Sequence, residues 1–109
     1  GDSFVMHQEK KMKFSLNLLD FEAQEFCEGI VSEMVSLFMI TEEEAITRVN
    51  CQWAHLESIG GNEELIYHED ERFWAQDIYY GPDSFWWLEN KVRSEKNLPK
   101  LVPKEIKNV

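Results

Sequence analysis

The residues best suited to chemistry lie between Leu65 and Leu88. This segment, LIYHEDERFWAQDIYYGPDSFWWL, holds eight of the fourteen aromatic residues and three of the four tryptophans. A histidine and several carboxylates lie among the rings, and such groups can bind ligands or transfer protons near neutral pH. The candidate binding residues are Tyr67, His68, Asp70, Trp74, Asp77, Tyr80, Trp86 and Trp87.

Asp77 is the acid that most needs an explanation. Helical spacing places it on an aromatic face with Phe73, Trp74 and Tyr80, and an unpaired buried carboxylate is costly. In a functional interpretation it faces a ligand or a partner protein. In a structural one it accepts a hydrogen bond from an indole, a tyrosine hydroxyl or a backbone amide. The structural interpretation is favoured, because buried polar groups usually have such partners.

His68 adjoins three acids in the run HEDE. A pocket joining His68 to Asp70 and Asp77, with Trp74 and Tyr80 as walls, would support small-molecule or metal-using activity. However, one histidine beside adjacent acids does not supply three or four converging ligands, so we predict no metal and no cofactor. The alternative is a solvated helix start, where acids complement the helix dipole.

Two further pairs of residues contain side chains that could react or bind a partner. Cys51 and His55 are four residues apart, a spacing that suits a nucleophile or half of a metal site, but no third member is recognisable. Trp86 and Trp87 cannot both face the core from one helix, since neighbours differ by about 100°. One of them is therefore expected to be partly exposed, as an interaction hot spot or a platform for stacking sugars or bases. The alternative is that the pair clamps the third helix onto the first two.

No catalytic signature accompanies these residues. The chain lacks GxSxG, GxxxxGK[ST], GxGxxG and HExxH, each of which would place reactive groups at a known turn or helix. Their absence weighs against an enzyme without excluding one.

The elements that must position the candidates are predicted to be helices. Asp20 is the expected N-cap of a first amphipathic helix, from Phe21 to about Met39. Thr41 and Glu44 form a capping box that starts a second helix, and we expect Gly60-Gly61 to end it.

A shorter third helix is predicted from Glu71 to Tyr80, capped by Asp70 and stopped by Gly81-Pro82. An aromatic turn containing Trp86 and Trp87 follows it. The fold class is therefore all-α: two longer amphipathic helices, with the short third helix and aromatic turn closing their open side. In this division residues 1–19 form an N-terminal strand or arm, 20–88 the helical domain, and 89–109 a basic C-terminal tail, extended against the acidic body.

The net charge is −10 and is unevenly distributed. From Asp20 to Asp83 there are sixteen acids against Arg48 and Arg72, a net of −14, whereas Glu89 to the end carries a net of +3. Such a body repels nucleic-acid phosphates and anionic membranes and attracts a basic protein surface. The simpler alternative is that the charge only maintains solubility.

Cysteine usage and hydropathy bear on the compartment. Cys27 and Cys51 lack CxxC spacing, and Cys27 lies on an apolar helical face, which favours a buried thiol and a reducing compartment. No apolar run approaches the roughly 20 residues that span a bilayer. We therefore expect a cytoplasmic protein, although the opening Gly1-Asp2 indicates processing or trimming and leaves a removed leader open.

Two stretches, ITEEEAITRVN with Trp53 and LIYHEDERFWAQDIYYG with Trp86-Trp87, carry a family resemblance. Between Ile40 and Trp87 the chain resembles a group of small uncharacterised bacterial proteins with EEEA…R-N…W and IYHED…WA…IYYG…WW signatures. The resemblance implies a bacterial source and no activity, ligand or catalytic residue.

Three hypotheses follow from the sequence. The leading one is a non-enzymatic protein-binding module that engages a basic partner, for example a toxin-neutralising immunity protein. The second is the small-molecule or metal-using protein with a pocket around His68, Asp70 and Asp77. The third is a homodimer whose aromatic segment is its own interface.

Overall fold

The computed structural model describes residues 12–60 and 65–106. Within this part of the chain the fold is all-α, with four α-helices, one short 3₁₀-helix and no strand. The predicted fold class is therefore confirmed. The first part of the predicted N-terminal arm, residues 1–11, and the end of the predicted tail, residues 107–109, lie outside the described residues.

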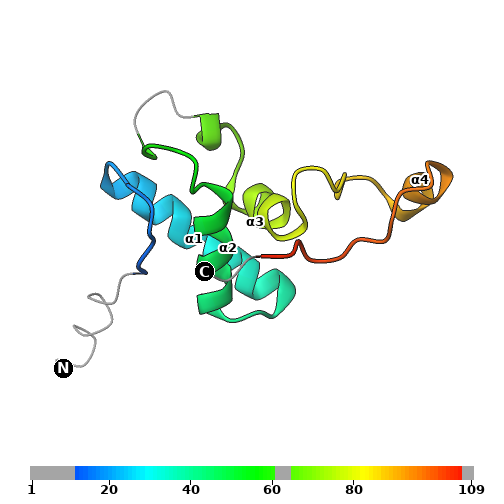
Figure 1. The fold of residues 1–109 in the computed structure, drawn as a ribbon, viewed down its shortest axis with the longest axis horizontal. Coiled ribbons are helices and arrows are strands. Elements are labelled where there is room, and N and C mark those ends of the chain that lie inside the picture. Colours follow the sequence, from blue (N-terminus) through cyan, green and yellow to red (C-terminus); the bar gives the residue numbers. More distant parts are fainter. Residues whose placement is uncertain (1–11, 61–64, 107–109) are drawn as a thin grey trace.

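The first helix, α1, spans Phe21–Phe38 and is the central element of the fold (Figure 1). Its predicted cap is confirmed, because the Asp20 carboxylate accepts a hydrogen bond of 2.9 Å from the Ala23 amide. It ends at Met39, which has a left-handed backbone with φ 59°. The face turned to the core is fully buried and comprises Ala23, Cys27, Ile30, Val31 and Met34.

The second helix, α2, spans Glu42–Gln52 and begins as predicted, with the Thr41 hydroxyl accepting from the Glu44 amide at 3.0 Å. The prediction that it continues to Gly60-Gly61 is wrong. The chain leaves the helix because Ile59, fully buried, pairs with the segment before α1. The Ile59 amide donates to the Asn17 carbonyl, and the Leu19 amide donates to the Ile59 carbonyl, both at 2.8 Å. Gly61 lies outside the described residues.

The third helix, α3, spans Glu71–Tyr80 as predicted and follows a 3₁₀-helix, η2, at Leu65–His68. Its cap is Asp70, whose carboxylate accepts from the Phe73 amide at 2.8 Å. Gly81 ends the helix with φ 99°, a conformation that favours glycine. The helix α1 packs against both α2 and α3, so these three helices form one body.

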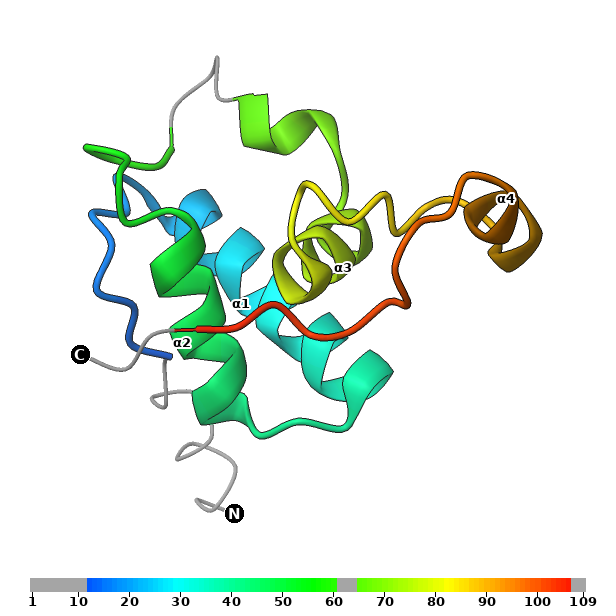
Figure 2. The same cartoon turned by 45° about the vertical axis from the view of Figure 1, so that its right-hand side comes forward.

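The fourth helix, α4, spans Asn90–Glu95. The prediction of an extended tail from residue 89 is thus wrong over this range, because α4 interrupts it. Residues 82–103, here called the arm, leave the three-helix body after α3, carry α4 at their far end and return to the body (Figures 1 and 2). At the base of the arm the Lys104 amide donates to the Tyr79 carbonyl at 2.7 Å.

Candidate functional site

Asp77 is buried, with 7% of its surface exposed, and has a defined partner. The indole nitrogen Nε1 of Trp86 donates to its Oδ1 at 2.9 Å. This is the hydrogen bond that the structural interpretation of Asp77 requires, and it joins α3 to the first residues of the arm. The contact accounts for an acid on an aromatic face without a ligand.

The rings of the candidate segment form a continuous series of contacts. Trp53 meets Trp74 edge to face at 5.5 Å between centroids, Phe73 contacts Trp74 and Trp86 at 5.2 and 5.3 Å, and Trp86 contacts Trp87 at 5.7 Å. The series begins at the buried Trp53 and ends at Trp87, which is 53% exposed. As expected, the two tryptophans differ in exposure: Trp86 is held by Asp77, and Trp87 is largely at the surface.

The candidate tyrosines are half-buried and pack against α1. Tyr67 meets Phe26 edge to face at 5.0 Å between centroids, and Tyr80 meets Phe38 in the same way at 5.3 Å. Burial, and to a lesser extent the neighbouring Tyr79, raises the pKa of Tyr80 above its ordinary value. Both tyrosines therefore help to hold α3 and η2 on α1.

His68, Asp70 and Asp77 have separate local surroundings. His68 is exposed at the end of η2, and the exposed Asp70 uses its carboxylate to cap α3. Asp77 is buried two turns further along and binds Trp86. The structure gives these three residues different neighbours, and none of them lines the pocket described below.

Cys51 and His55 do not share a helical face, because α2 ends at Gln52. Both side chains are exposed. Cys27, in contrast, is fully buried, and burial followed by the nearby Glu28 raises the pKa of its thiol to about 12. Within residues 12–60 and 65–106, no three His, Cys, Asp or Glu side chains are grouped so that they could hold a metal ion.

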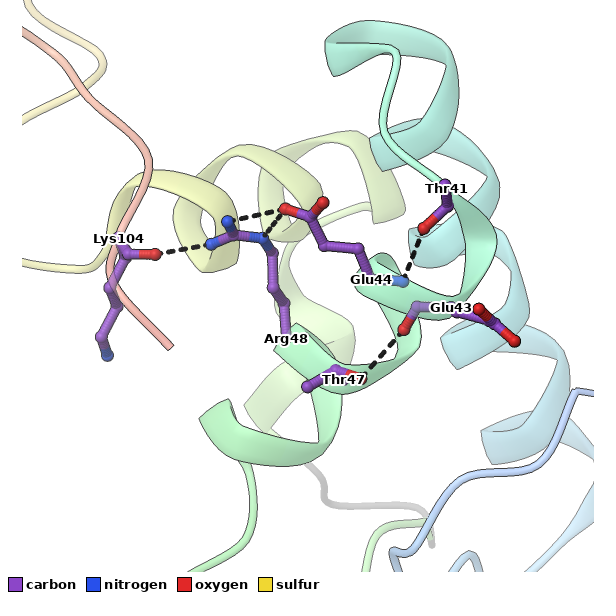
Figure 3. A network of polar contacts seen from close by, with 6 residues as sticks. All are labelled: Thr41, Glu43, Glu44, Thr47, Arg48 and Lys104. Carbon is purple, nitrogen blue, oxygen red and sulfur yellow. Dashed lines mark hydrogen bonds and ion pairs between the residues drawn. The ribbon is translucent and has the colours of Figure 1, made fainter. Parts of the chain in front are cut away.

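Arg48 joins α2 to the returning chain (Figure 3). Its guanidinium donates to one carboxylate oxygen of Glu44 at 2.8 and 2.9 Å and to the Lys104 carbonyl at 2.7 Å. It also lies 4.8 Å from the centroid of the Tyr79 ring, within cation–π range. This side chain thus fixes the base of the arm from the α2 side.

A pocket of about 390 Å³ lies beside this junction. Its lining comprises Arg48, Cys51, Gln52, Ala54, Ile78, Lys104, Glu105 and Ile106. None of the eight candidate binding residues lines the pocket, although Cys51 does. Arg48 already has acceptors for its guanidinium. Nothing in this lining identifies a ligand.

The arm has its own internal anchor in Arg93, a buried cation. The guanidinium donates to the carbonyls of Ser84 and Phe85 at 2.8 and 2.7 Å. It also donates to the carbonyl of Pro99, on the returning side. Arg93 therefore holds the outgoing and returning parts of the arm together, while Phe85, Trp87 and Val102 stay exposed.

The acids of the body are mostly at the surface and mostly without cationic partners. Glu22 and Glu25 on α1 and Glu42 and Glu43 on α2 are all exposed. Among the described residues one ion pair forms, between Arg48 and Glu44. The negative charge expected from the sequence is thus presented to solvent.

The sequence prediction missed three residues that matter to this surface. Met39 is 88% exposed, Phe85 is exposed on the arm, and Arg93 organises the arm. Helical periodicity could not find Arg93, because the carbonyls that accept its hydrogen bonds lie outside the helices. Met39 follows the last apolar residues of α1. Its position just past the end of the helix could have indicated that its side chain is exposed.

Comparison with protein-family models, curated proteins and solved structures gave no match to this chain. In the described part of the chain, no helix combines the length and apolar character needed to cross a bilayer.

Proposed function

We propose that this protein is a non-enzymatic binding module whose acidic body engages a basic protein. The observation that carries the proposal is the set of exposed acids on α1 and α2 facing solvent, with a single ion pair among the described residues. Carboxylates left in this state create a negative potential that attracts a positively charged surface and speeds its encounter.

Glu22 and Glu25 represent this surface best. They lie in the first two turns of α1, are exposed, and follow the exposed Phe21. An apolar ring beside two carboxylates suits a partner that presents lysines or arginines around an apolar contact, since interfaces combine an apolar centre with a polar rim. The exposed Trp87 offers a second anchor of the type common at interaction hot spots.

One concrete form of the proposal is a bacterial immunity protein that neutralises a basic nuclease toxin in the cytoplasm. The support is the match of charge and size, together with the absence of a membrane-spanning helix in the described residues. The match is an analogy at the level of the molecule and assigns no residue.

The experiment is affinity capture from the bacterial lysate at low salt, followed by a direct affinity measurement on the retained protein. We expect a partner with a basic isoelectric point, bound with an association rate that falls steeply as NaCl increases. Failure to retain any basic protein, or an affinity that does not change with NaCl concentration, would contradict the proposal.

A matched pair of variants makes the test specific. The double variant Glu22→Gln, Glu25→Gln removes two charges from α1, and Glu89→Gln, Glu95→Gln removes two exposed charges from the arm. The α1 variant should slow association several-fold at low salt, whereas the arm variant should leave the rate nearly unchanged. Equal effects of the two variants would point to net charge rather than to this surface.

A further inference from the structure

The arm is an ordered projection with an uncovered apolar surface. Phe85, Trp87 and Val102 are 44%, 53% and 61% exposed, and the rings of Phe85 and Trp87 lie 5.5 Å apart. Arg93 fixes this shape through carbonyls on both sides of the arm. A surface that is already ordered loses little entropy when a partner covers it, so an arm of this kind is suited to docking.

The returning side of the arm is positively charged. Between residues 96 and 103 the arm carries Lys96 and Lys100 and no acid, and Lys104 follows at its base. All three side chains are exposed. The surface that covers this side of the arm should therefore be acidic and partly apolar.

The body of the same chain offers such a surface at the connection between α1 and α2, residues 39–43, here called the corner. Met39 is 88% exposed, and Glu42 and Glu43 beside it are exposed. Glu44, next in sequence, is held by Arg48, whereas no described cation pairs with Glu42 or Glu43. In Figures 1 and 2 the corner runs along the lower edge of the body, below α3, and the arm extends sideways from the end of α3.

We infer that two copies of this chain form a dimer. In this dimer the lysines of each arm lie against the corner of the other copy. In a dimer with two-fold symmetry, an axis that places one arm on the corner of the other copy also places the second arm on the first corner. Each arm then covers part of its apolar surface with the Met39 region of its partner. This interface covers Glu42, Glu43 and the arm and leaves Glu22 and Glu25 open, so it goes beyond the proposed function, whose variant test uses those two α1 residues.

The first test is the oligomeric state of the full chain by sedimentation equilibrium. We expect a reversible dimer. A monomer at several hundred micromolar would overturn the inference and would indicate that the arm docks on a different molecule or on nothing.

The second test identifies the contact by exchanging charges. The arm variant carries Lys96→Glu and Lys100→Glu, and the corner variant carries Glu42→Lys and Glu43→Lys. Each variant alone opposes like charges at both contacts of its dimer, so each should dimerise at least about tenfold more weakly. Mixed together they oppose unlike charges at both contacts, so an equimolar mixture should form a heterodimer.

Misfolded variants would not form a heterodimer when mixed. An arm-to-arm interface would leave the corner variant dimeric on its own, because its arm lysines are unchanged. The control Glu22→Lys, Glu25→Lys has the charge change of the corner variant at another place and should remain dimeric. Far-ultraviolet circular dichroism confirms that each variant is folded. Two folded variants that stay monomeric when mixed, or a control that dissociates equally, would overturn the arm-to-corner contact. Neither result bears on the capture of a basic partner through Glu22 and Glu25.

Discussion

Asp77 and Trp86 form a hydrogen bond that connects α3 to the first residues of the arm. The bond is 2.9 Å long, and the carboxylate is buried. Forming a buried hydrogen bond adds little net stability to the fold. Removing one partner costs more, because the other polar group is then buried without a partner or water. Asp77 therefore has a structural role, which is to hold Trp86 and the start of the arm on α3.

Replacing Asp77 tests this role. Asp77→Ala removes the acceptor and leaves the Trp86 indole N–H without a partner, so the free energy of unfolding should fall by about 1–3 kcal/mol. Asp77→Asn keeps an oxygen acceptor and should lose less than about 1 kcal/mol. Urea unfolding followed by tryptophan fluorescence measures both. Equal losses for the two variants would show that the acceptor is not what matters.

Cys27 gives the protein a pH dependence on the alkaline side. Its thiol ionises near 9.0 in the unfolded reference and near 12 in the folded protein, because burial disfavours the thiolate. The unfolded chain therefore loses this proton first. The stabilisation is complete below pH 9 and is lost as pH rises toward 12, with a slope of at most about 1.4 kcal/mol per pH unit. The raised pKa of Tyr80 acts in the same direction.

Denaturant unfolding at about pH 8 and about pH 10.5 checks this expectation. The native protein should lose stability between the two conditions, and Cys27→Ala should lose distinctly less. A variant with the same pH slope as the native protein would assign the loss to other groups. Cys51→Ser, at an exposed thiol, is the matched control and should keep the native slope.

At the scale of the elements, the arm depends on Arg93 more than on packing with the body. The helix α4 has six residues and contributes one buried side chain, that of Arg93. Short isolated helices are marginal in water, so the carbonyl contacts of Arg93 must supply the order that helix propensity does not.

Arg93→Met should loosen the arm and spare the body. Methionine retains an apolar stem but donates no hydrogen bonds, which leaves the carbonyls of Ser84, Phe85 and Pro99 without this donor. Chymotrypsin should then cleave at residues 85–88 several-fold faster, while the denaturant midpoint of the helical body changes little. Lys91→Met, at an exposed site on the same helix, should leave the cleavage rate unchanged. Cleavage at an unaltered rate in Arg93→Met would contradict this role.

The sequence predicted those elements whose signals are local. Asp20, Thr41 and Asp70 cap the predicted helices because each hydroxyl or carboxylate needs only an amide three residues away. The end of α2 was missed because it depends on Ile59 pairing with the distant segment before α1. The helix α4 was missed because its composition is that of a charged tail, and Arg93 finds its acceptors only in three dimensions.

The same distinction applies to the candidate site. An acid on an aromatic face could be recognised from spacing, and a bonded indole was one of the predicted partners of Asp77. Which tryptophan provides it depends on the path of the turn after Gly81. The exposure of Trp87 and Met39 depends on how the arm and corner lie, which helical periodicity does not encode.

At the scale of the whole molecule, unbalanced charge opposes the folded state. The net charge is −10, and one ion pair forms among the described residues. Bringing the acids together on a compact body costs electrostatic free energy that the expanded chain largely avoids. Dissolved salt screens that repulsion over roughly 10 Å at 0.1 M ionic strength.

Stability should therefore rise with NaCl. Between low salt and about 0.5 M NaCl we expect a gain on the order of 1 kcal/mol, measured by urea unfolding at a fixed low protein concentration. The double variant Glu22→Gln, Glu25→Gln should be more stable at low salt and gain less. A free energy of unfolding that stays constant or falls as NaCl increases would show that repulsion between the acids does not destabilise the folded protein.

The hydrogen bond between the Lys104 amide and the Tyr79 carbonyl has a consequence for the history of the chain. It brings the two ends of the arm side by side, so residues 82–103 leave the three-helix body and return to the place where they left it. A short glycine-containing turn could bridge these ends at a small cost in loop closure. Length variation among descendants of this sequence is therefore expected at this junction, where segments can be gained or removed without rebuilding the core.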